Sequence, residues 1–176
     1  MQILITGCAG FIGYHLTKKL LKNKKLILGV DNLDPYYDVN LKKDRIKNLK
    51  ENKNFKYYKF DLNNKKKIKG LFNNYKIKIV IHLAAQAGVR FSIIKPENYL
   101  KSNIDGFFNI LDISRIYKVK HFMYASSSSV YGLSSKYPTD EKQQTDMPLS
   151  FYAATKKSNE IFAHSYSNIY KLPTTG

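Results

Sequence analysis

An α/β fold with a doubly wound parallel sheet is the fold class that the sequence predicts. Short apolar runs alternate with amphipathic helical patterns along the 176 residues, and this alternation is typical of βαβ units. The run at residues 77–83 is almost continuously apolar, as expected of a strand buried on both faces of a parallel sheet. The run at residues 3–5 leads into three closely spaced glycines. These three observations place the chain in one such domain.

The three glycines are Gly7, Gly10 and Gly13. Gly7 allows a tight turn off the strand, Gly10 lets the backbone approach a pyrophosphate, and Gly13 lets the next helix pack closely. A helical stripe follows, made of Ile12, Leu16 and Leu20. A strand, a glycine turn and a helix N-terminus form the phosphate-binding start of a Rossmann-type dinucleotide-binding unit. The alternative is a glycine-rich turn that holds no ligand.

The second apolar run, residues 26–30, ends at Asp31. An acidic side chain roughly twenty residues beyond the glycines accepts hydrogen bonds from an adenosine ribose. It would also repel a 2′-phosphate, and the next residue is Asn32 rather than an arginine. NAD is therefore favoured over NADP. The alternative is that Asp31 only caps the end of the strand.

The middle of the chain continues the alternation. We expect a helix at about residues 41–51, a strand at 55–60, a helix at 65–75 and the strand at 77–83. Asp61 follows the third strand, at the edge of the sheet where ligands of doubly wound folds bind, so it is placed to reach an adenine. The small residues at 84–88 either leave room for a cofactor or simply pack tightly.

A helix is expected to begin at Pro96. Its apolar stripe consists of Leu100, Ile104, Phe107, Phe108 and Leu111. Asn103 interrupts the stripe, and we expect its side chain to hold either a loop or the cofactor. A fifth strand is expected at residues 121–125.

Two features beyond the fifth strand carry chemistry. The first is a run of serines at residues 126–129, which places hydroxyl groups at the carboxyl end of a strand. The second is the pair Tyr152 and Lys156, which share a helix face because they are four residues apart. A nearby ammonium stabilises a phenolate and lowers its pKa from about 10, which makes Tyr152 a candidate base. The two features follow a dinucleotide loop in the expected order. The three motifs together indicate a dinucleotide-dependent enzyme more strongly than any one of them alone.

The composition argues against several classes of protein. The net charge is +17, but nearly all of it comes from lysines scattered along the chain, so we expect no specific nucleic-acid site. No apolar run has membrane-spanning length, and Cys8 is the single cysteine. We therefore expect a cytoplasmic protein, with Cys8 filling a tight loop. The four histidines are isolated in the sequence, and no metal site is predicted.

Longer motifs carry a family resemblance. They are the segments at residues 36–42, 84–90, 126–132 and 150–157, together with the glycine loop, Asp31-Asn32 and Asp61-Leu62. On these motifs the chain resembles the extended short-chain dehydrogenase/reductase superfamily. Within it, the chain is most similar to the NAD-dependent nucleotide-sugar epimerases of the UDP-glucuronate 4-epimerase group. The resemblance covers essentially the whole sequence.

The resemblance implies a set of NAD contacts. The pyrophosphate is held by the glycine loop, the adenosine ribose and adenine by two polar strand ends, and the rest of the cofactor by a channel of small residues. The implied residues are Gly7, Gly10, Phe11, Ile12, Gly13, Asp31, Asn32, Asp61, Leu62, Leu83, Ala84 and Ala85, with Tyr152 and Lys156 at the nicotinamide end.

The resemblance also implies a mechanism on a UDP-sugar. Tyr152 takes the proton of the sugar 4-hydroxyl while hydride passes from C4 to NAD and later returns to the other face. Lys156 binds the nicotinamide ribose, and Ser127 binds the 4-oxygen. Ser128 and Ser129 help to hold a sugar carboxylate, and Arg90 is a candidate anion contact.

The serine loop favours epimerisation over related reactions. Dehydratases of this superfamily carry acidic residues in this loop, because elimination of water needs both an acid and a base. The related decarboxylases carry a glutamate just before the Val-Tyr pair, where this chain has Ser129. The alternatives are epimerisation of UDP-glucose or a UDP-N-acetylhexosamine, and a catalytically inactive NAD-binding fragment.

The chain is shorter than members of this family. We expect residues 1–176 to form an incomplete NAD-binding domain, truncated before its sixth strand and lacking the C-terminal substrate-binding part. A homodimer is possible through the helices expected at about residues 96–117 and 151–170.

Overall fold

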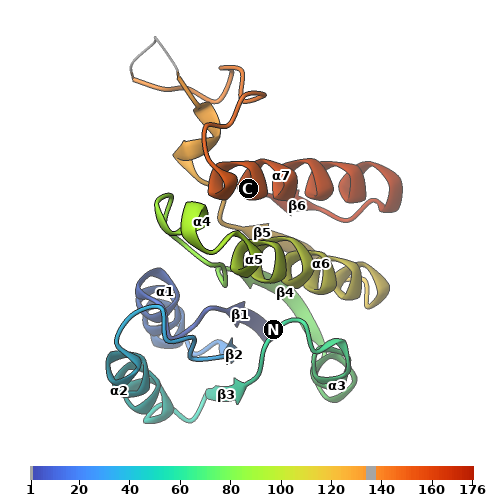
Figure 1. The fold of residues 1–176 in the computed structure, drawn as a ribbon. Coiled ribbons are helices and arrows are strands. Elements are labelled where there is room, and N and C mark those ends of the chain that lie inside the picture. The colour runs from blue at the N-terminus through green and yellow to red at the C-terminus, as the bar shows by residue number, and fades with distance from the viewer. Residues whose placement is uncertain (1, 134–137) are drawn as a thin grey trace.

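The computed structural model describes residues 2–133 and 138–176. Its strands, in chain order, are β1 (Gln2–Thr6), β2 (Leu26–Asp31), β3 (Phe55–Lys59), β4 (Ile77–His82), β5 (His121–Tyr124) and β6 (Thr174–Thr175). They form one sheet in the order β3-β2-β1-β4-β5-β6, and all five neighbouring pairs are parallel (Figure 1). This is the strand order of a doubly wound Rossmann-type sheet, so the predicted fold class is confirmed.

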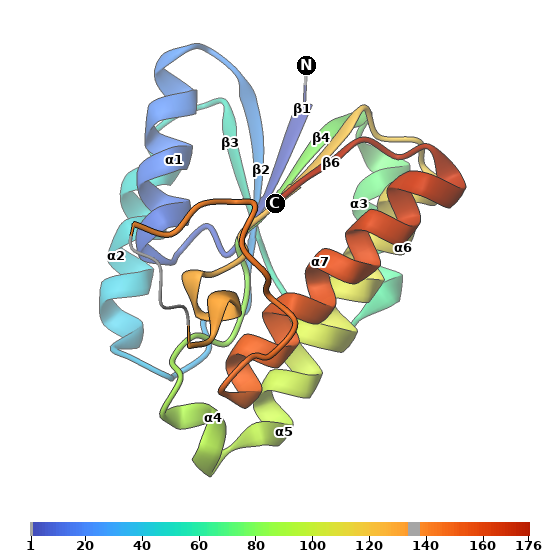
Figure 2. The same cartoon turned by 90° about the horizontal axis from the view of Figure 1, so that it is seen from above.

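The helices connect the strands and cover both faces of the sheet. They are α1 (Phe11–Lys22), α2 (Val39–Lys50), α3 (Lys65–Asn74), α4 (Phe91–Ile94), α5 (Pro96–Tyr99), the π-helical segment η1 (Leu100–Asp105), α6 (Gly106–Ile116), the 3₁₀ turn η2 (Ser128–Tyr131) and α7 (Phe151–Tyr170). Figure 2 shows α1 and α2 on one face, and α3, α6 and α7 on the other. The sheet is therefore the middle of three layers.

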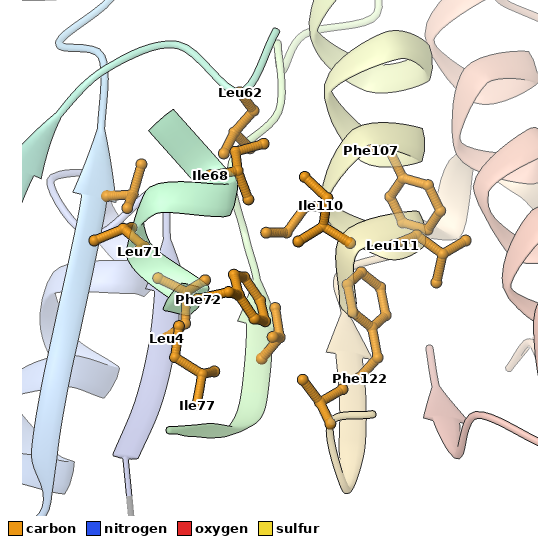
Figure 3. Packing of buried hydrophobic residues seen from close by; sticks show 14 of the residues in the cluster. Leu4, Leu62, Ile68, Leu71, Phe72, Ile77, Phe107, Ile110, Leu111 and Phe122 are labelled. Carbon is orange, nitrogen blue, oxygen red and sulfur yellow. The ribbon is translucent and has the colours of Figure 1, made fainter. Parts of the chain in front are cut away.

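Two hydrophobic cores lie against the two faces of the sheet, because successive strand residues point to opposite sides. Ile3 and Ile5 pack against α1 and α2, whereas Leu4 between them packs on the side of α3 and α6. Figure 3 shows the second core, in which Phe72 of α3 lies near Leu4 and α6 lies above Phe122. Burial on both faces explains why the strand at 77–82 reads as an almost continuous apolar run.

The end of the sheet differs from the prediction. A truncation before the sixth strand is wrong in its detail, because Thr174 and Thr175 form β6 and pair with Phe122 and Met123 of β5. Two residues are too short for a strand to be read from sequence periodicity. The strand forms here because the end of α7 returns the chain to the edge of β5.

The helix expected from Pro96 onward is interrupted. The chain forms α5, then six residues of π-helix, and only then α6. Asn103, the polar residue in the expected stripe, lies in the middle of the π segment and is buried. π-helical turns inside α-helices are rare and occur frequently at functional sites. The hydrogen bonds of Asn103 are therefore described with the candidate site below.

Candidate functional site

A pocket opens at the carboxyl ends of the central strands, next to the point between β1 and β4 where the strand order reverses. This is the place where doubly wound folds bind their ligands. The pocket is lined by nine of the residues that the sequence singled out: Gly7, Gly10, Asp31, Asn32, Asp61, Leu62, Leu83, Ala84 and Ala85. Residues from four separate strand ends thus meet in one cavity.

The glycine loop has two positions that exclude a Cβ and one, Gly10, where a Cβ would make a single close contact. Gly7 has φ +72°, and a Cβ there would lie 2.7 Å from the backbone nitrogen of Ala84. A Cβ on Gly13 would lie 2.1 Å from the Gly7 carbonyl oxygen. A Cβ on Gly10 would meet only that same oxygen, at 3.2 Å. Gly7 and Gly13 are therefore required by packing, whereas Gly10 keeps the backbone accessible on its pocket side.

The N-terminus of α1 is suited to an anion. Gly10 is its N-cap and has no side chain to cap the helix, so the first backbone N–H groups have no side-chain acceptor. Phe11 and Ile12 in the first turn are exposed. The free N–H groups and the partial positive charge of the helix end favour a phosphate at this position.

Asp31 lines the pocket and is buried. One carboxylate oxygen accepts a hydrogen bond from the Ala9 N–H at 3.0 Å, and the other accepts one from the Leu33 N–H at 2.9 Å. The carboxylate thus fixes the backbone at the end of β2, which is the capping role considered above as the alternative to ribose binding. Each oxygen retains acceptor capacity, so the same group faces the pocket as a hydrogen-bond acceptor.

Asp61 lies beside Asn32 on the rim of the pocket. The Asn32 side-chain amide donates to Asp61 at 3.1 Å, and the backbone N–H and side chain of Asn63 donate at 2.9 and 2.7 Å. Burial alone would raise the pKa of Asp61, but these hydrogen bonds outweigh it and lower the pKa. Asp61 is therefore an ionised acceptor at neutral pH.

The side chain of Lys42 also lines the pocket, although no role was predicted for it. It is buried, its ammonium donates to the Asp34 carbonyl oxygen at 2.7 Å, and it lies 4.2 Å from the centre of the Tyr37 ring. A signal was present in the sequence. Lys42 occupies the buried face of α2 in register with Ile46 and Leu49, and a lysine at a core position needs a polar partner.

Tyr152 and Lys156 lie on the first half of α7, whose N-cap is Ser150. The Lys156 side chain is buried, and its ammonium donates to the Ala125 carbonyl oxygen at 2.9 Å. Ala125 immediately precedes the serine run, so Lys156 is attached to the base of that loop. The Tyr152 ring is half-buried and packs edge-on against Tyr99 at 6.1 Å between ring centres.

The serine loop is held from within and from α7. The Ser127 hydroxyl oxygen caps η2 by accepting from the Ser129 N–H at 3.1 Å. The Ser126 hydroxyl donates to Glu160 of α7 at 2.6 Å. Ser128 is exposed and Ser129 is half-buried. Arg90 is exposed at the start of α4 and does not line the pocket.

Asn103 holds a loop, which is one of the two roles expected of it. Its side-chain oxygen accepts from the Gln86 N–H at 2.8 Å, and its amide donates to the Gln86 carbonyl oxygen at 3.1 Å and to the Thr155 hydroxyl at 3.0 Å. The Asn159 side chain donates to the Asn103 carbonyl oxygen at 2.6 Å. These bonds connect the pocket loop after β4 to α7, next to Lys156.

Lys156 gives the site a pH signature. Burial lowers its pKa from 10.5 to about 8. Between these values the unfolded chain binds a proton that the folded chain has released, so raising the pH favours the folded state. We expect the free energy of unfolding of the wild type to rise relative to Lys156→Met between pH ~8 and ~10.5. Urea unfolding of both proteins at several pH values measures this difference, and parallel pH dependences would contradict it.

Other expectations concern Cys8, metal binding and the membrane. Cys8 is fully buried in the glycine loop, and burial raises the pKa of its thiol, so it fills space as expected. Within residues 2–133 and 138–176, no three side chains of the metal-ligating types cluster. In the same residues, no helix has both the length and the apolar character that a membrane span needs.

Comparison with known proteins adds a family match and curated relatives. The family model described as GDP-mannose 4,6 dehydratase matches residues 4–176. The chain is 51% identical over 176 residues to Protein CapI of Staphylococcus aureus, covering all of this chain and 52% of that protein. It is 47% identical over 169 residues to the UDP-glucuronate 4-epimerase of Thermodesulfobacterium geofontis, covering 96% of this chain and 52% of that protein. The chain spans about half the length of these relatives.

Solved structures give the same result. The UDP-glucuronic acid 4-epimerase of Bacillus cereus, in complex with UDP-glucuronic acid and NAD, matches with a TM-score of 0.89 and 34% identity, over 99% of this chain and 55% of that chain. The UDP-glucose 4-epimerase of Thermotoga maritima, with UDP-glucose, matches with a TM-score of 0.87 and 33% identity, over 99% of this chain and 53% of that chain. The resemblance to nucleotide-sugar epimerases is confirmed.

Proposed function

We propose, since this chain belongs to the GDP-mannose 4,6 dehydratase family, that it forms the NAD-binding part of a nucleotide-sugar 4-epimerase of the cytoplasm. UDP-glucuronate is the proposed substrate and UDP-galacturonate the product. One observation carries the proposal: a pocket lined by the glycine loop, Asp31 and Asp61 is joined through Gln86 and Asn103 to α7, the helix that carries Tyr152 and Lys156. Tyr152 and Lys156 do not themselves line this pocket. Residues 1–176 are proposed to be an incomplete NAD-binding domain.

The pocket fits NAD by its shape and charge. The backbone of Gly10, which lines the pocket, and the uncapped N-terminus of α1 suit a pyrophosphate. Asp31 suits ribose hydroxyls and would repel a 2′-phosphate. Asp61 and Leu62 are proposed to flank the adenine, and Lys42 lines the same pocket. Leu83, Ala84 and Ala85 line the channel. A bound NAD would supply a reversible hydride acceptor for the sugar C4.

Tyr152 is proposed as the base that removes the proton of the sugar 4-hydroxyl and later returns it. Lys156 lies one helical turn further on, and its ammonium is proposed to bind the nicotinamide ribose. Ser127, at the base of η2, is proposed to donate a hydrogen bond to the 4-oxygen. Ser128 and Ser129 are proposed contacts of the sugar carboxylate, and Arg90 of an anion.

The serine loop favours epimerisation over dehydration. No carboxylate lies within residues 126–129. Glu160 does reach the loop from α7, but its carboxylate accepts from Ser126 and lies 3.6 Å from the Lys157 ammonium. A carboxylate held by these two groups at the base of the loop is poorly placed to reach a leaving hydroxyl.

Two alternative functions and a homodimer are also to be tested. The likeness to the Thermotoga maritima UDP-glucose 4-epimerase supports UDP-glucose, or a UDP-N-acetylhexosamine, as an alternative substrate, and a catalytically inactive NAD-binding fragment is the second alternative. Exposed apolar side chains on α6 and α7, including Phe108, Ile161 and Ile169, support a homodimer through these helices.

The proposal is tested by an epimerisation assay with two proteins. One is the 176-residue chain, and the other joins it to the part of the Staphylococcus aureus relative beyond the match. Each is incubated with UDP-glucuronate and NAD, and the two 4-epimers are separated by chromatography. Formation of UDP-galacturonate by either protein supports the proposal. Conversion of UDP-glucose but not of UDP-glucuronate supports the alternative substrate. NAD binding without any conversion supports the inactive fragment.

A further inference from the structure

A single hydroxyl group joins the glycine loop to the channel after β4. Thr6 is the last residue of β1, directly before Gly7, and its side chain is fully buried. Its hydroxyl oxygen accepts from the backbone N–H of Ala84 at 3.2 Å, and from that of Leu83 at 3.2 Å, which it shares with the Thr6 carbonyl oxygen. It also lies 2.8 Å from Nδ1 of His82. Three hydrogen bonds therefore converge on one atom between two cofactor-lining segments.

The hydrogen-bonding capacity of this hydroxyl determines the state of His82. A threonine hydroxyl has two acceptor lone pairs and one proton. Because the lone pairs receive the N–H groups of Leu83 and Ala84, the proton is directed at His82. Nδ1 of His82 is then an acceptor without a proton, and the neutral ring carries its proton on Nε2. Protonation of Nδ1 would place two donors against each other and break this arrangement.

The surroundings of His82 also oppose a charge. Its ring is buried against Phe107 of α6 at 5.3 Å and Phe122 of β5 at 6.2 Å between ring centres. From α7 the group that faces it is the Lys156 ammonium, and from β5 its neighbour in the sheet is Tyr124. Burial, followed by the charge of Lys156, lowers the pKa of His82 to about 3.

His82 is linked to Lys156 through one residue. The Ala125 N–H donates to the His82 carbonyl oxygen at 3.2 Å, and the Ala125 carbonyl oxygen accepts from Lys156 at 2.9 Å. A second positive charge on His82 would thus lie close to Lys156 among buried side chains, where like charges repel more strongly than in water. The neutral ring leaves Lys156 as the cation at this position.

We propose that Thr6 and His82 are positioning residues of this site: the Thr6 hydroxyl locks His82 in its neutral Nε2–H form beside Lys156 and fixes the channel at Leu83 and Ala84 against the glycine loop. The link to Lys156 as a functional group rests on the function proposed above. The tautomer of His82 and the hydrogen bonds from Leu83 and Ala84 to Thr6 are properties of the folded chain alone. They are measured without substrate.

The test compares Thr6→Val, which removes the hydroxyl at nearly constant volume, with Thr6→Ser, which keeps it. The full chain is labelled with ¹⁵N-histidine, and long-range ¹H–¹⁵N spectra are recorded from pH ~5.5 to ~8, the range in which free histidine titrates. Comparison with His82→Asn identifies the His82 signals among the four histidines. We expect an unchanging Nε2–H ring in the wild type and in Thr6→Ser, and a mixture of tautomers in Thr6→Val.

NAD affinity, measured by calorimetry, is the second readout. We expect Thr6→Val to bind NAD about tenfold more weakly, as loss of one or two hydrogen bonds to the channel implies, and Thr6→Ser to bind as the wild type does. An Nδ1–H tautomer in the wild type, or a His82 that titrates near pH ~6.5, would overturn the proposal, even if Thr6→Val failed to fold. So would an unchanged tautomer in folded Thr6→Val. Absence of NAD binding in the wild type would overturn the proposed function instead, because the spectra are independent of it.

Discussion

Replacing Tyr152 by phenylalanine is expected to abolish most epimerase activity while leaving NAD binding intact. The substitution removes only the phenol oxygen, and the ring contact with Tyr99 remains. General acid–base catalysis by a positioned side chain contributes about 10²- to 10⁴-fold in rate, so kcat should fall by about that factor. The measurement is the chromatographic assay on whichever of the two proteins converts UDP-glucuronate.

Tyr170→Phe is the matched control for this prediction. Tyr170 ends the same helix, is partly exposed and lies far along α7 from Tyr152, so the same chemical change there should leave kcat unchanged. A Tyr152→Phe protein that retains wild-type kcat would show that another group moves the proton. Equal losses of kcat in both variants would indicate a general effect on α7 rather than on catalysis.

The second large effect is expected at Gly13. An alanine Cβ would lie 2.1 Å from the Gly7 carbonyl oxygen, and neither backbone segment can yield without disturbing the junction of β1 and α1. We expect Gly13→Ala to lower the free energy of unfolding by about 3 kcal/mol or more, as severe overpacking does. Urea unfolding followed by circular dichroism measures this loss.

Gly70→Ala provides the comparison for the same substitution. Gly70 lies inside α3, and a Cβ there would meet no atom within 4 Å. Alanine is favoured over glycine in a helix, so this variant should be more stable by about 0.5–1 kcal/mol. If Gly13→Ala were as stable as the wild type, the close approach of α1 to the glycine turn would not be a requirement of the fold.

Much of the fold could be predicted because its determinants are local in the sequence. Strands buried on both faces appear as apolar runs, and the glycine spacing after β1 reports a turn that packing enforces at Gly7 and Gly13. The pairing of Thr174 and Thr175 with β5 could not be predicted in this way, because it depends on where α7 places the chain and not on any local pattern.

The site was predictable where one motif contains it, and not where the fold assembles it from distant segments. Asp31, Asp61 and Ala84 were expected at strand ends and line the pocket. Lys42 reaches the pocket only because α2 packs against α1 and β3. The link from Asn103 to Gln86 depends on a π-helical segment that helical periodicity does not show. The Thr6–His82 pair joins residues 76 positions apart, which no sequence spacing reveals.

The most direct test of the central claim is a calorimetric titration of the 176-residue chain with NAD and, separately, with NADP. We expect saturable binding of NAD, and binding of NADP weaker by at least about tenfold, because Asp31 opposes a 2′-phosphate. Asp31→Asn should reduce this preference while circular dichroism shows the fold retained. A folded chain that binds neither cofactor, or that binds NADP as tightly as NAD, would contradict the assignment of the pocket.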